Sequence, residues 1–327
     1  MEKIRVGMIR GDLHALYYGA QMFDYDPIEM RKRGHSARPT KGYAALYYHY
    51  THYNDPAAMT VPFVGGFQLV KTWDANPERA QVVADCFDDQ VQVCDSPEQC
   101  SDDVDLLFIA DCNGDGSDHL ELATPGLEKG VPTFVDKPLA YSLADAQAIV
   151  KLAQDNDTLM LSLSMLRVVP HGAYFRDRLQ EIAPVGYGSI NGGGIHGISL
   201  AQQVFGPGVE AVDCMGPAEL AYLHLDYGGK PDKPEAGVMI NGASGPTYHC
   251  SLYVSAFSAA GAIHSGQIGD YEFPYGSAKV LEMVKKMVQT GEPQWDYDQM
   301  IECIAIAEAG RLAQKEGRRV RLDEVMN

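Results

Sequence analysis

Two ionisable residues, Asp136 and Lys137, follow a short apolar segment in a pattern that favours chemistry. Asp105–Ala110 reads as a buried strand, His119–Glu128 as a helix and Thr133–Val135 as a second strand. Apolar strands that alternate with helices are typical of a parallel sheet covered on both faces. Ligands of such sheets bind outside the carboxyl ends of the strands, so we expect both residues at a binding site.

The loop after the first of these strands carries Asn113 and Cys112. Asn113 is predicted at the same sheet edge as Lys137, whereas we expect Cys112 to be a bystander. The loop resembles the start of a calcium-binding loop, which needs a bidentate glutamate at its twelfth position. That position is Leu122, and the segment follows a strand instead of a helix. We therefore expect no metal here.

Length and charge exclude several classes of protein. A chain of 327 residues is long enough for two domains. A net charge of −18 disfavours nucleic-acid and anionic-membrane partners, which need clustered Lys and Arg. No apolar run approaches the roughly 20 residues of a membrane helix, and no signal sequence is evident, so we expect a cytoplasmic protein. The seven cysteines form no CxxC pair, which predicts reduced thiols.

The first domain is predicted to span residues 1–166. Its strands are Ile4–Ile9, Phe67–Trp73 and Thr158–Ser164 together with the two above, and Leu13–Phe23 is a predicted helix. An insertion at about 26–65 is rich in aromatic residues and histidine: Tyr43, Tyr47, Tyr48, His49, Tyr50, His52 and Tyr53. It either packs as a flap or subunit contact, or closes as a lid over a polyhydroxylated ligand. In the second case His49 and His52 contact substrate.

The second domain is predicted to span residues 167–327. A helix at His171–Leu179 precedes glycine-rich strands with turn signals, which favour an antiparallel sheet: Gly186–Gly194, Val209–Met215, Glu219–Tyr227, Val238–Ala243 and Tyr248–Ala259. Two helices, Ser277–Thr290 and Tyr297–Glu316, end the chain. The predicted fold class is α/β, with an N-terminal Rossmann-type doubly wound parallel sheet and a C-terminal α+β domain whose open sheet is mostly antiparallel.

Several motifs in this order resemble the glucose–fructose oxidoreductase/inositol dehydrogenase/MocA family. They are Asp74 with the following ANPERAQVVA, the loop from Asn113 to His119, Asp-Lys-Pro at 136–138, Arg167, Gly-Ile-His-Gly-Ile-Ser at 194–199, and the closing AIAEAGRLAQKEGRRVRL. Members are NAD(P)-dependent dehydrogenases that act mostly on sugars and cyclic polyols. The resemblance therefore implies a small sugar or polyol substrate. It also implies a homodimer or homotetramer formed through the open-sheet domain.

The resemblance also implies roles for individual residues. Lys137 would contact the substrate hydroxyl and the nicotinamide ribose, and stabilise the alkoxide as hydride leaves. Asp136 would hold that geometry, and His196 would be the general base, unless it only caps backbone groups in a strand. The implied cofactor contacts are Gly7, Arg10, Gly11, Asp12, Asp74, Asn113, His119 and Lys137. The implied substrate contacts are Arg167, Tyr187, His196, His49 and His52.

Asp74 decides between the two nicotinamide cofactors. An acidic side chain at the end of the second strand accepts hydrogen bonds from the ribose hydroxyls of NAD and repels the 2′-phosphate of NADP. The resemblance therefore favours NAD over NADP.

The chain departs from the family pattern at two places. Arg10, Asp12 and Ala15 stand where relatives carry the three glycines of the dinucleotide fingerprint. A carboxylate at position 12 would cap the helix amides that bind a diphosphate and would repel it. Many relatives also carry an Asp four residues before the catalytic His, where this chain has Gly192. Tyr187, His249 or the insertion could replace it.

Two kinds of function remain open from the sequence. The first is an NAD-dependent dehydrogenase that oxidises a secondary alcohol. A variant of it keeps NAD tightly bound for elimination or hydrolysis. The second is a relative that has lost cofactor binding and acts as a sugar sensor or an assembly partner.

Overall fold

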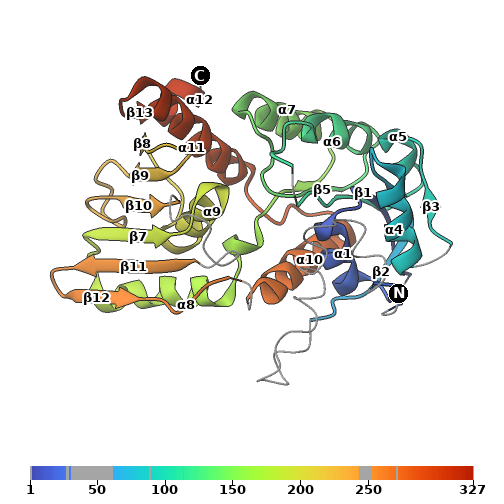
Figure 1. Ribbon diagram of the computed structural model, residues 1–327, viewed down its shortest axis with the longest axis horizontal. Helices are drawn as coiled ribbons and strands as arrows, with labels where there is room; N and C mark the ends of the chain where they lie inside the picture. Colours follow the sequence, from blue (N-terminus) through green and yellow to red (C-terminus); the bar gives the residue numbers. More distant parts are fainter. Residues whose placement is uncertain are drawn as a thin grey trace. The chain divides into compact units, whose positions relative to one another are not determined.

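The computed structural model describes residues 2–26, 29–30, 62–87, 90–112, 114–242, 252–269 and 272–326. The chain forms two compact units (Figure 1). Unit 1 comprises Met1–Leu163 with Ser277–Asp296, and unit 2 comprises Ser164–Gly276 with Tyr297–Asn327. The division thus lies after Leu163 instead of residue 166, and the return of a late segment to unit 1 is not predicted by the sequence. Several candidates lie outside the described residues: Asn113, His49, His52, His249 and most of the insertion.

Unit 1 is built on the predicted parallel sheet, with strand order β3-β2-β1-β4-β5-β6. The strands are β1 (Ile4–Ile9), β2 (Phe67–Trp73), β3 (Gln92–Val93), β4 (Leu106–Ile109), β5 (Thr133–Val135) and β6 (Met160–Leu161). The strand order reverses between β1 and β4, and doubly wound sheets bind ligands at that point. The fold therefore places the loops after β1, β4 and β5 together at one edge.

Helices cover both faces of this sheet. They are α1 (Leu13–Met22), α4 (Pro77–Phe87), α5 (Pro97–Cys100), α6 (His119–Glu128), α7 (Leu143–Asp155) and α10 (Phe273–Thr290), of which the last joins unit 1 from Ser277 onward. Helix α1 packs beside α4, while α5, α6 and α7 pack in a row. The Ser142 hydroxyl accepts a hydrogen bond from the Asp145 amide at 3.0 Å and so caps the N-terminus of α7.

Strand β6 ends before Ser164, its predicted last residue, because Ser164 belongs to the next element of the chain. Its hydroxyl caps a short 3-10 helix, η1 (Met165–Arg167), by accepting the Leu166 amide. The chain therefore leaves the sheet after Leu161 and enters unit 2.

Unit 2 contains a seven-stranded sheet in the order β12-β11-β7-β10-β9-β8-β13. Its strands are β7 (Tyr187–Asn191), β8 (Ala211–Met215), β9 (Tyr222–Asp226), β10 (Val238–Asn241), β11 (Tyr253–Ser258), β12 (Gly261–His264) and β13 (Val320–Arg321). All neighbouring strands pair antiparallel except β7 and β10. The predicted mostly antiparallel sheet is confirmed.

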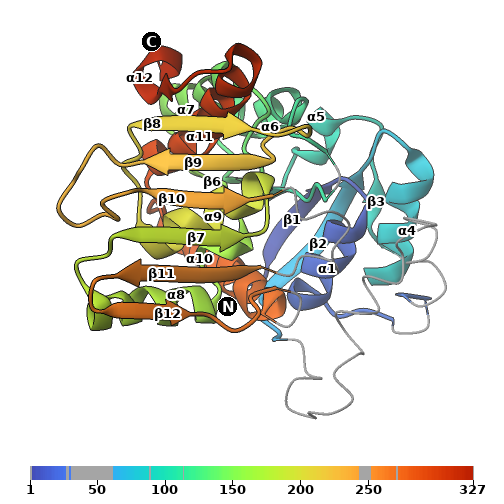
Figure 2. The ribbon, with the colours of Figure 1, turned by 60° about the vertical axis from the view of Figure 1, so that its left-hand side comes forward.

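One face of this sheet is covered by helices α8 (Pro170–Arg178), α9 (Gly194–Phe205) and α11 (Tyr297–Glu316). Figure 2 looks onto the strands with α9 behind them. Helix α11 has its predicted bounds and ends at Gly317, whose φ of 65° suits a residue without Cβ. The short helix α12 (Leu322–Met326) follows β13.

The segment around His196 differs from the prediction. A strand is predicted to Gly194, but β7 ends at Asn191 and α9 begins at Gly194. Gly192 and Gly194 have φ angles of 131° and 59°, which turn the chain out of the sheet. The following ISLAQQVF then buries its side chains as a helix. His196 therefore lies in the first turn of a helix and not in a strand.

The same geometry explains why position 192 carries no carboxylate. A Cβ at Gly192 would lie 2.7 Å from the Leu252 side chain. In addition, Gly192 and His196 are not two steps apart on one strand, so the predicted same-face relation does not exist.

In the part of the chain that the structure describes, no helix is both long enough and apolar enough to cross a bilayer.

Candidate functional site

Lys137 lies at the carboxyl end of β5, as predicted. Its half-buried ammonium donates a hydrogen bond to the Cys112 carbonyl in the loop after β4, at 3.2 Å. An ammonium has three donors, so this contact fixes its position and leaves hydrogen-bonding capacity for a ligand. The neighbouring Asp136 is fully buried, and its Oδ1 accepts the Lys137 amide at 2.7 Å.

Asp136 also binds a residue that the sequence motifs do not single out. His14, in the first turn of α1, forms a short hydrogen bond through Nδ1 to Asp136 Oδ2. Burial alone would lower the pKa of His14, but the Asp136 carboxylate and Cys112 raise it to about 10. At neutral pH His14 is therefore an imidazolium.

Asp12 occupies the start of α1 in the way that the sequence predicts. Its Oδ1 accepts the His14 amide at 2.9 Å, and its Oδ2 accepts the Cys112 amide at 2.8 Å. The side chain is only 3% exposed, and this burial raises its pKa although His14 and the two amides oppose the rise. The carboxylate thus joins the loop after β1 to the loop after β4.

Arg10 precedes this cap with a φ of 77°, a left-handed backbone where glycine is favoured. Its guanidinium forms a short ion pair with Asp118 and lies 3.8 Å from Asp111 Oδ2. Burial alone would lower the pKa of Arg10, but these two carboxylates raise it. Arg10 is therefore committed to the protein's own acidic groups.

His119 is fully buried and supports the turn that carries Lys137. Its Nδ1 donates to the Pro138 carbonyl at 2.9 Å, and its Nε2 lies 3.4 Å from Asp111 Oδ2. Burial alone would raise the pKa of Asp111, but His119, the Gly114 amide and Arg10 hold it well below its usual range. In this structure His119 is a positioning residue, because its contacts with the Pro138 carbonyl and Asp111 support the turn that carries Lys137.

Asp111, Asp118 and His119 offer three ligand atoms within 4.8 Å of one another, a spacing that a metal ion could use. Arg10, however, already pairs with both carboxylates. We therefore assign no metal to this cluster.

The family's cofactor can be tested against these residues. A dinucleotide places its diphosphate on the backbone amides at the start of the first helix, a position that we call the diphosphate seat. Here the Asp12 carboxylate accepts the His14 amide in that seat. Asp74, Asp111 and Asp118 add further negative charge nearby, and both Asp74 oxygens accept backbone amides, from Gly11 and Asn76. The residues present do not fit a diphosphate.

The glycines of this region have packing reasons of their own. A Cβ at Gly7 would lie 2.2 Å from the Cys100 carbonyl of α5, and one at Gly11 would lie 2.4 Å from the Arg79 carbonyl of α4. Both glycines allow helices to approach β1 and its loop. Their presence therefore does not require a cofactor.

The candidates in unit 2 do not converge on one point. Arg167 is 6% exposed and donates to the side chains of Gln202 and Gln299, and burial lowers its pKa. Tyr187 stacks on Phe257 of β11, with ring centroids 5.6 Å apart, on the sheet face opposite α9. Because His196 lies on α9, the structure does not bring Tyr187 to it.

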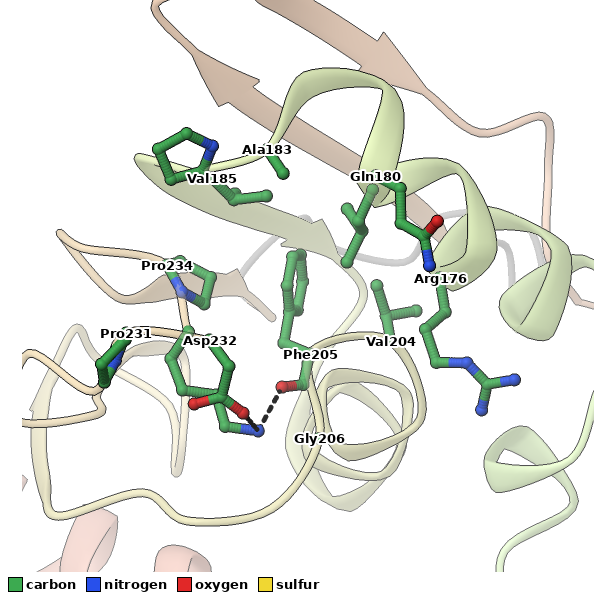
Figure 3. A pocket seen from close by; sticks show the side chains of 13 residues that line it. Arg176, Gln180, Ala183, Val185, Val204, Phe205, Gly206, Pro231, Asp232 and Pro234 are labelled. Carbon is green, nitrogen blue, oxygen red and sulfur yellow. Dashed lines mark hydrogen bonds and ion pairs between the residues drawn. The ribbon is translucent and has the colours of Figure 1, made fainter.

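Unit 2 also has a pocket of about 460 Å³ between α8, the end of α9 and the loop before β10. Figure 3 shows apolar residues of its lining, including Phe205 and Pro234. The Lys233 ammonium, which also lines the pocket, donates to the Phe205 carbonyl at 2.9 Å. None of the predicted site residues lines this pocket, and the Lys233 ammonium already donates to a backbone carbonyl.

Comparisons with known proteins agree with the fold and the motifs. Residues 42–163 match the model of the GFO_IDH_MocA family, described as an oxidoreductase family with an NAD-binding Rossmann fold. The family resemblance that the sequence predicts is thereby confirmed. A search of curated proteins gave no match.

Solved structures share this architecture along nearly their whole length. A probable dehydrogenase from Thermotoga maritima has a TM-score of 0.67 at 15% identity, covering 98% of this chain and 100% of that chain. A myo-inositol dehydrogenase from Corynebacterium glutamicum gives 0.68 at 15% identity, with 98% and 99% covered. An oxidoreductase from Agrobacterium radiobacter in complex with NAD+, L-tartaric acid and magnesium gives 0.69 at 13% identity, with 98% and 99% covered. At these identities the likeness shows the fold.

The His14–Asp136 pair leads to a stability prediction. Replacing His14 with Asn leaves a fully buried carboxylate without its charged partner, which typically costs about 3–5 kcal/mol. We expect a loss near the lower end of that range in the free energy of urea unfolding at pH 6. Because the pKa of His14 is raised in the folded protein, this stabilisation is complete below the unfolded pKa of 6.5 and disappears as the pH rises through about 10.

The difference between wild type and His14→Asn should therefore shrink from pH 6 to pH 10. Lys151→Ala, which removes an exposed pair with Asp155, is the control and should change stability by less than about 0.5 kcal/mol. A difference between wild type and His14→Asn that stays constant with pH would show that the pair is not charged as described.

Proposed function

We propose that this chain acts on a hydroxyl-bearing small molecule of the sugar or polyol class, at the edge of the unit 1 sheet beside Lys137. We further propose that it does so without a nicotinamide dinucleotide in the diphosphate seat. The observation that carries the proposal is the Asp12 carboxylate, which is buried and accepts the amides of His14 and Cys112. The proposal shares the loss of cofactor binding with the sugar sensor or assembly partner that the sequence leaves open, but it adds a reaction at Lys137.

The charges of the site support action on a substrate oxygen. Lys137 and His14 bring two positive groups to one edge. Asp136 contacts both residues, since its Oδ2 binds the His14 imidazole and its Oδ1 accepts the Lys137 backbone amide. Fixed positive groups in a partly buried site stabilise negative charge that develops on oxygen during a reaction. The sugar or polyol class comes from the family resemblance and from the myo-inositol dehydrogenase among the similar structures.

A second candidate is the NAD-dependent dehydrogenase that oxidises a secondary alcohol. The family match and the NAD+ complex of the Agrobacterium radiobacter oxidoreductase favour it. In that case Asp74 would select NAD over NADP. The two candidates differ in one property, which is whether the chain binds a dinucleotide.

Calorimetric titration with NAD and NADP separates the candidates. We expect wild type to bind both more weakly than about 1 mM, which corresponds to about −4 kcal/mol. We expect Arg10→Gly/Asp12→Gly to bind NAD at least tenfold more tightly, a gain of about 1.4 kcal/mol, because it removes the carboxylate from the seat.

Asp12→Asn is the matched control, because asparagine also caps helices but carries no charge. A gain in Asp12→Asn alone would assign the exclusion to charge, and a gain only in the double variant would assign it to occupancy of the amides. Wild-type binding in the submillimolar range that is lost in Asp74→Ala would establish the dehydrogenase instead.

Turnover tests the role of Lys137. Sugars and cyclitols are screened by mass spectrometry of the products, with and without added NAD. For a substrate found in this way, Lys137→Ala should lower turnover about a hundredfold, or about 3 kcal/mol of transition-state stabilisation. Lys151→Ala, an exposed lysine on α7, should leave turnover unchanged. Equal turnover in a folded Lys137→Ala protein would remove Lys137 from the mechanism.

The open face of the unit 2 sheet supports self-association. Tyr253, Tyr222 and Phe257 are 43%, 38% and 36% exposed there. Exposed aromatic residues grouped on one face are typical of a subunit contact. We expect a dimer or tetramer by light scattering, and dissociation in Tyr253→Lys/Phe257→Lys. A monomeric mass of wild type at micromolar concentration would contradict this.

A further inference from the structure

Three side chains at the edge of the unit 1 sheet contact one another in series. The Asp136 carboxylate binds the His14 imidazole. Asp12 joins the backbone of Cys112 to that of His14, because its two oxygens accept both amides, and a hydrogen bond with the Cys112 side chain is one of the causes that raise the pKa of His14. These residues come from the end of β5, the first turn of α1 and the loop after β4. A nucleophile, a base and a group that orients the base are the three parts of a nucleophilic centre.

Cys112 differs from the other cysteines in its exposure. Of the six cysteines in the described ranges, five are buried and Cys112 is partly exposed. Its backbone is fixed on both sides, because its amide donates to Asp12 Oδ2 at 2.8 Å and its carbonyl accepts the Lys137 ammonium at 3.2 Å. The backbone of Cys112 is therefore held in place, and the residue is partly exposed.

Tyr18 gives an independent sign that a polar ligand belongs here. Its ring meets the His14 ring edge-on, with centroids 5.7 Å apart, and the residue is fully buried. Among the described residues its hydroxyl finds no hydrogen-bond partner. Burial raises the pKa of Tyr18, and the Asp136 carboxylate adds to the rise. A buried hydroxyl without a partner among the described residues is a place where a ligand or water can supply an oxygen.

We propose that Cys112 is a nucleophile that cleaves esters or lactones, with His14 as its proton-transfer partner. Asp136 is the positioning residue that orients His14, and the Lys137 ammonium stabilises the oxyanion that forms on the attacked carbonyl. This activity goes beyond the proposed function. It rests on that function only for the natural substrate class, which would be an ester or lactone of a polyhydroxylated compound.

The reaction balances with water as the only co-reactant. The thiolate sulfur of Cys112 attacks the carbonyl carbon, an S–C bond forms, and the C–O bond to the leaving alcohol breaks. The leaving alkoxide takes a proton from the His14 imidazolium. Water then attacks the thioester carbon and gives a proton to His14, and the C–S bond breaks. The net change is ester plus water to carboxylic acid plus alcohol, and no electron acceptor is needed.

The probe is p-nitrophenyl acetate, which does not depend on sugar recognition. Wild type should release a burst of nitrophenolate equal to one site per chain, and peptide mass mapping should place one acetyl group on Cys112. Cys112→Ala should abolish the burst, whereas Cys214→Ser, which alters a buried cysteine of unit 2, should retain it. A burst that survives Cys112→Ala, or an acetyl group found on another residue, would overturn the proposal.

Variants of His14 and Cys112 test the roles proposed for these two side chains. His14→Asn should slow acylation about a hundredfold, the usual range for loss of a proton-transfer group. Because this variant is destabilised, Cys112→Ser serves as a second test. It keeps the size of the side chain and should acylate far more slowly than wild type, because a hydroxyl is a weaker nucleophile than a thiolate. Acylation of Cys112→Ser at the wild-type rate would contradict thiolate attack.

Asp136→Asn should move the alkaline limb of the pH profile of acylation to lower pH. The groups that face His14 are Asp136, Cys112, Asp12 and Tyr18, and Asp136 contributes most to keeping the ring protonated. A purely structural role for Asp136 would lower the rate by the same factor at every pH. That outcome would remove the carboxylate from the proposed centre. Failure of the acetyl test leaves sugar binding, measured separately by calorimetry, unaffected.

Discussion

The hydrogen bond between His14 and Asp136 is the interaction on which the site depends. It joins the helix that follows β1 to the end of β5, two segments that are 122 residues apart in the chain. A buried carboxylate requires a charged or hydrogen-bonding partner, and a buried imidazole requires a carboxylate to stay protonated. Each residue therefore lowers the free-energy cost of burying the other. Together they bring positive charge to the edge of a sheet whose loops are otherwise acidic.

The acidic character of that edge is the observation behind the proposal that this chain differs in cofactor binding from the NAD-binding family model that residues 42–163 match. A parallel doubly wound sheet generates an anion site wherever a helix begins after its first strand. In this chain Asp12 caps that helix, and Arg10 pairs with Asp118 instead of remaining available for a phosphate. The chain keeps the architecture of the matched family. Two side chains, Arg10 and Asp12, change the charges of the loop after its first strand.

Much of this could be predicted from the sequence. Strand β1 is a short, mostly apolar segment and helix α11 has apolar residues at helical spacing, and both have the predicted bounds. The capping role of Asp12 follows from its position before the first turn of α1. Local pattern therefore identified the parallel sheet, its loops and the residue that alters the first loop.

The remaining parts of the site depend on tertiary contacts. Nothing in the local sequence shows that the loop after β4 passes over the first turn of α1. The sequence therefore predicts only a bystander role for Cys112 and does not single out His14. The helix at His196 was missed for a different reason. A glycine-rich segment fits a strand or a turn equally well, and the φ angles at Gly192 and Gly194 decide between them.

The contact between Asp12 and the Cys112 amide has a consequence for how this chain could change over evolution. One carboxylate occupies a helix amide of the diphosphate seat and also anchors the loop that carries the Cys112 thiol. A substitution of Asp12 that frees that amide would release the loop in the same step. Under the two proposals above, dinucleotide binding and sulfur chemistry place opposite demands on this residue, so a lineage that gained one would weaken the other.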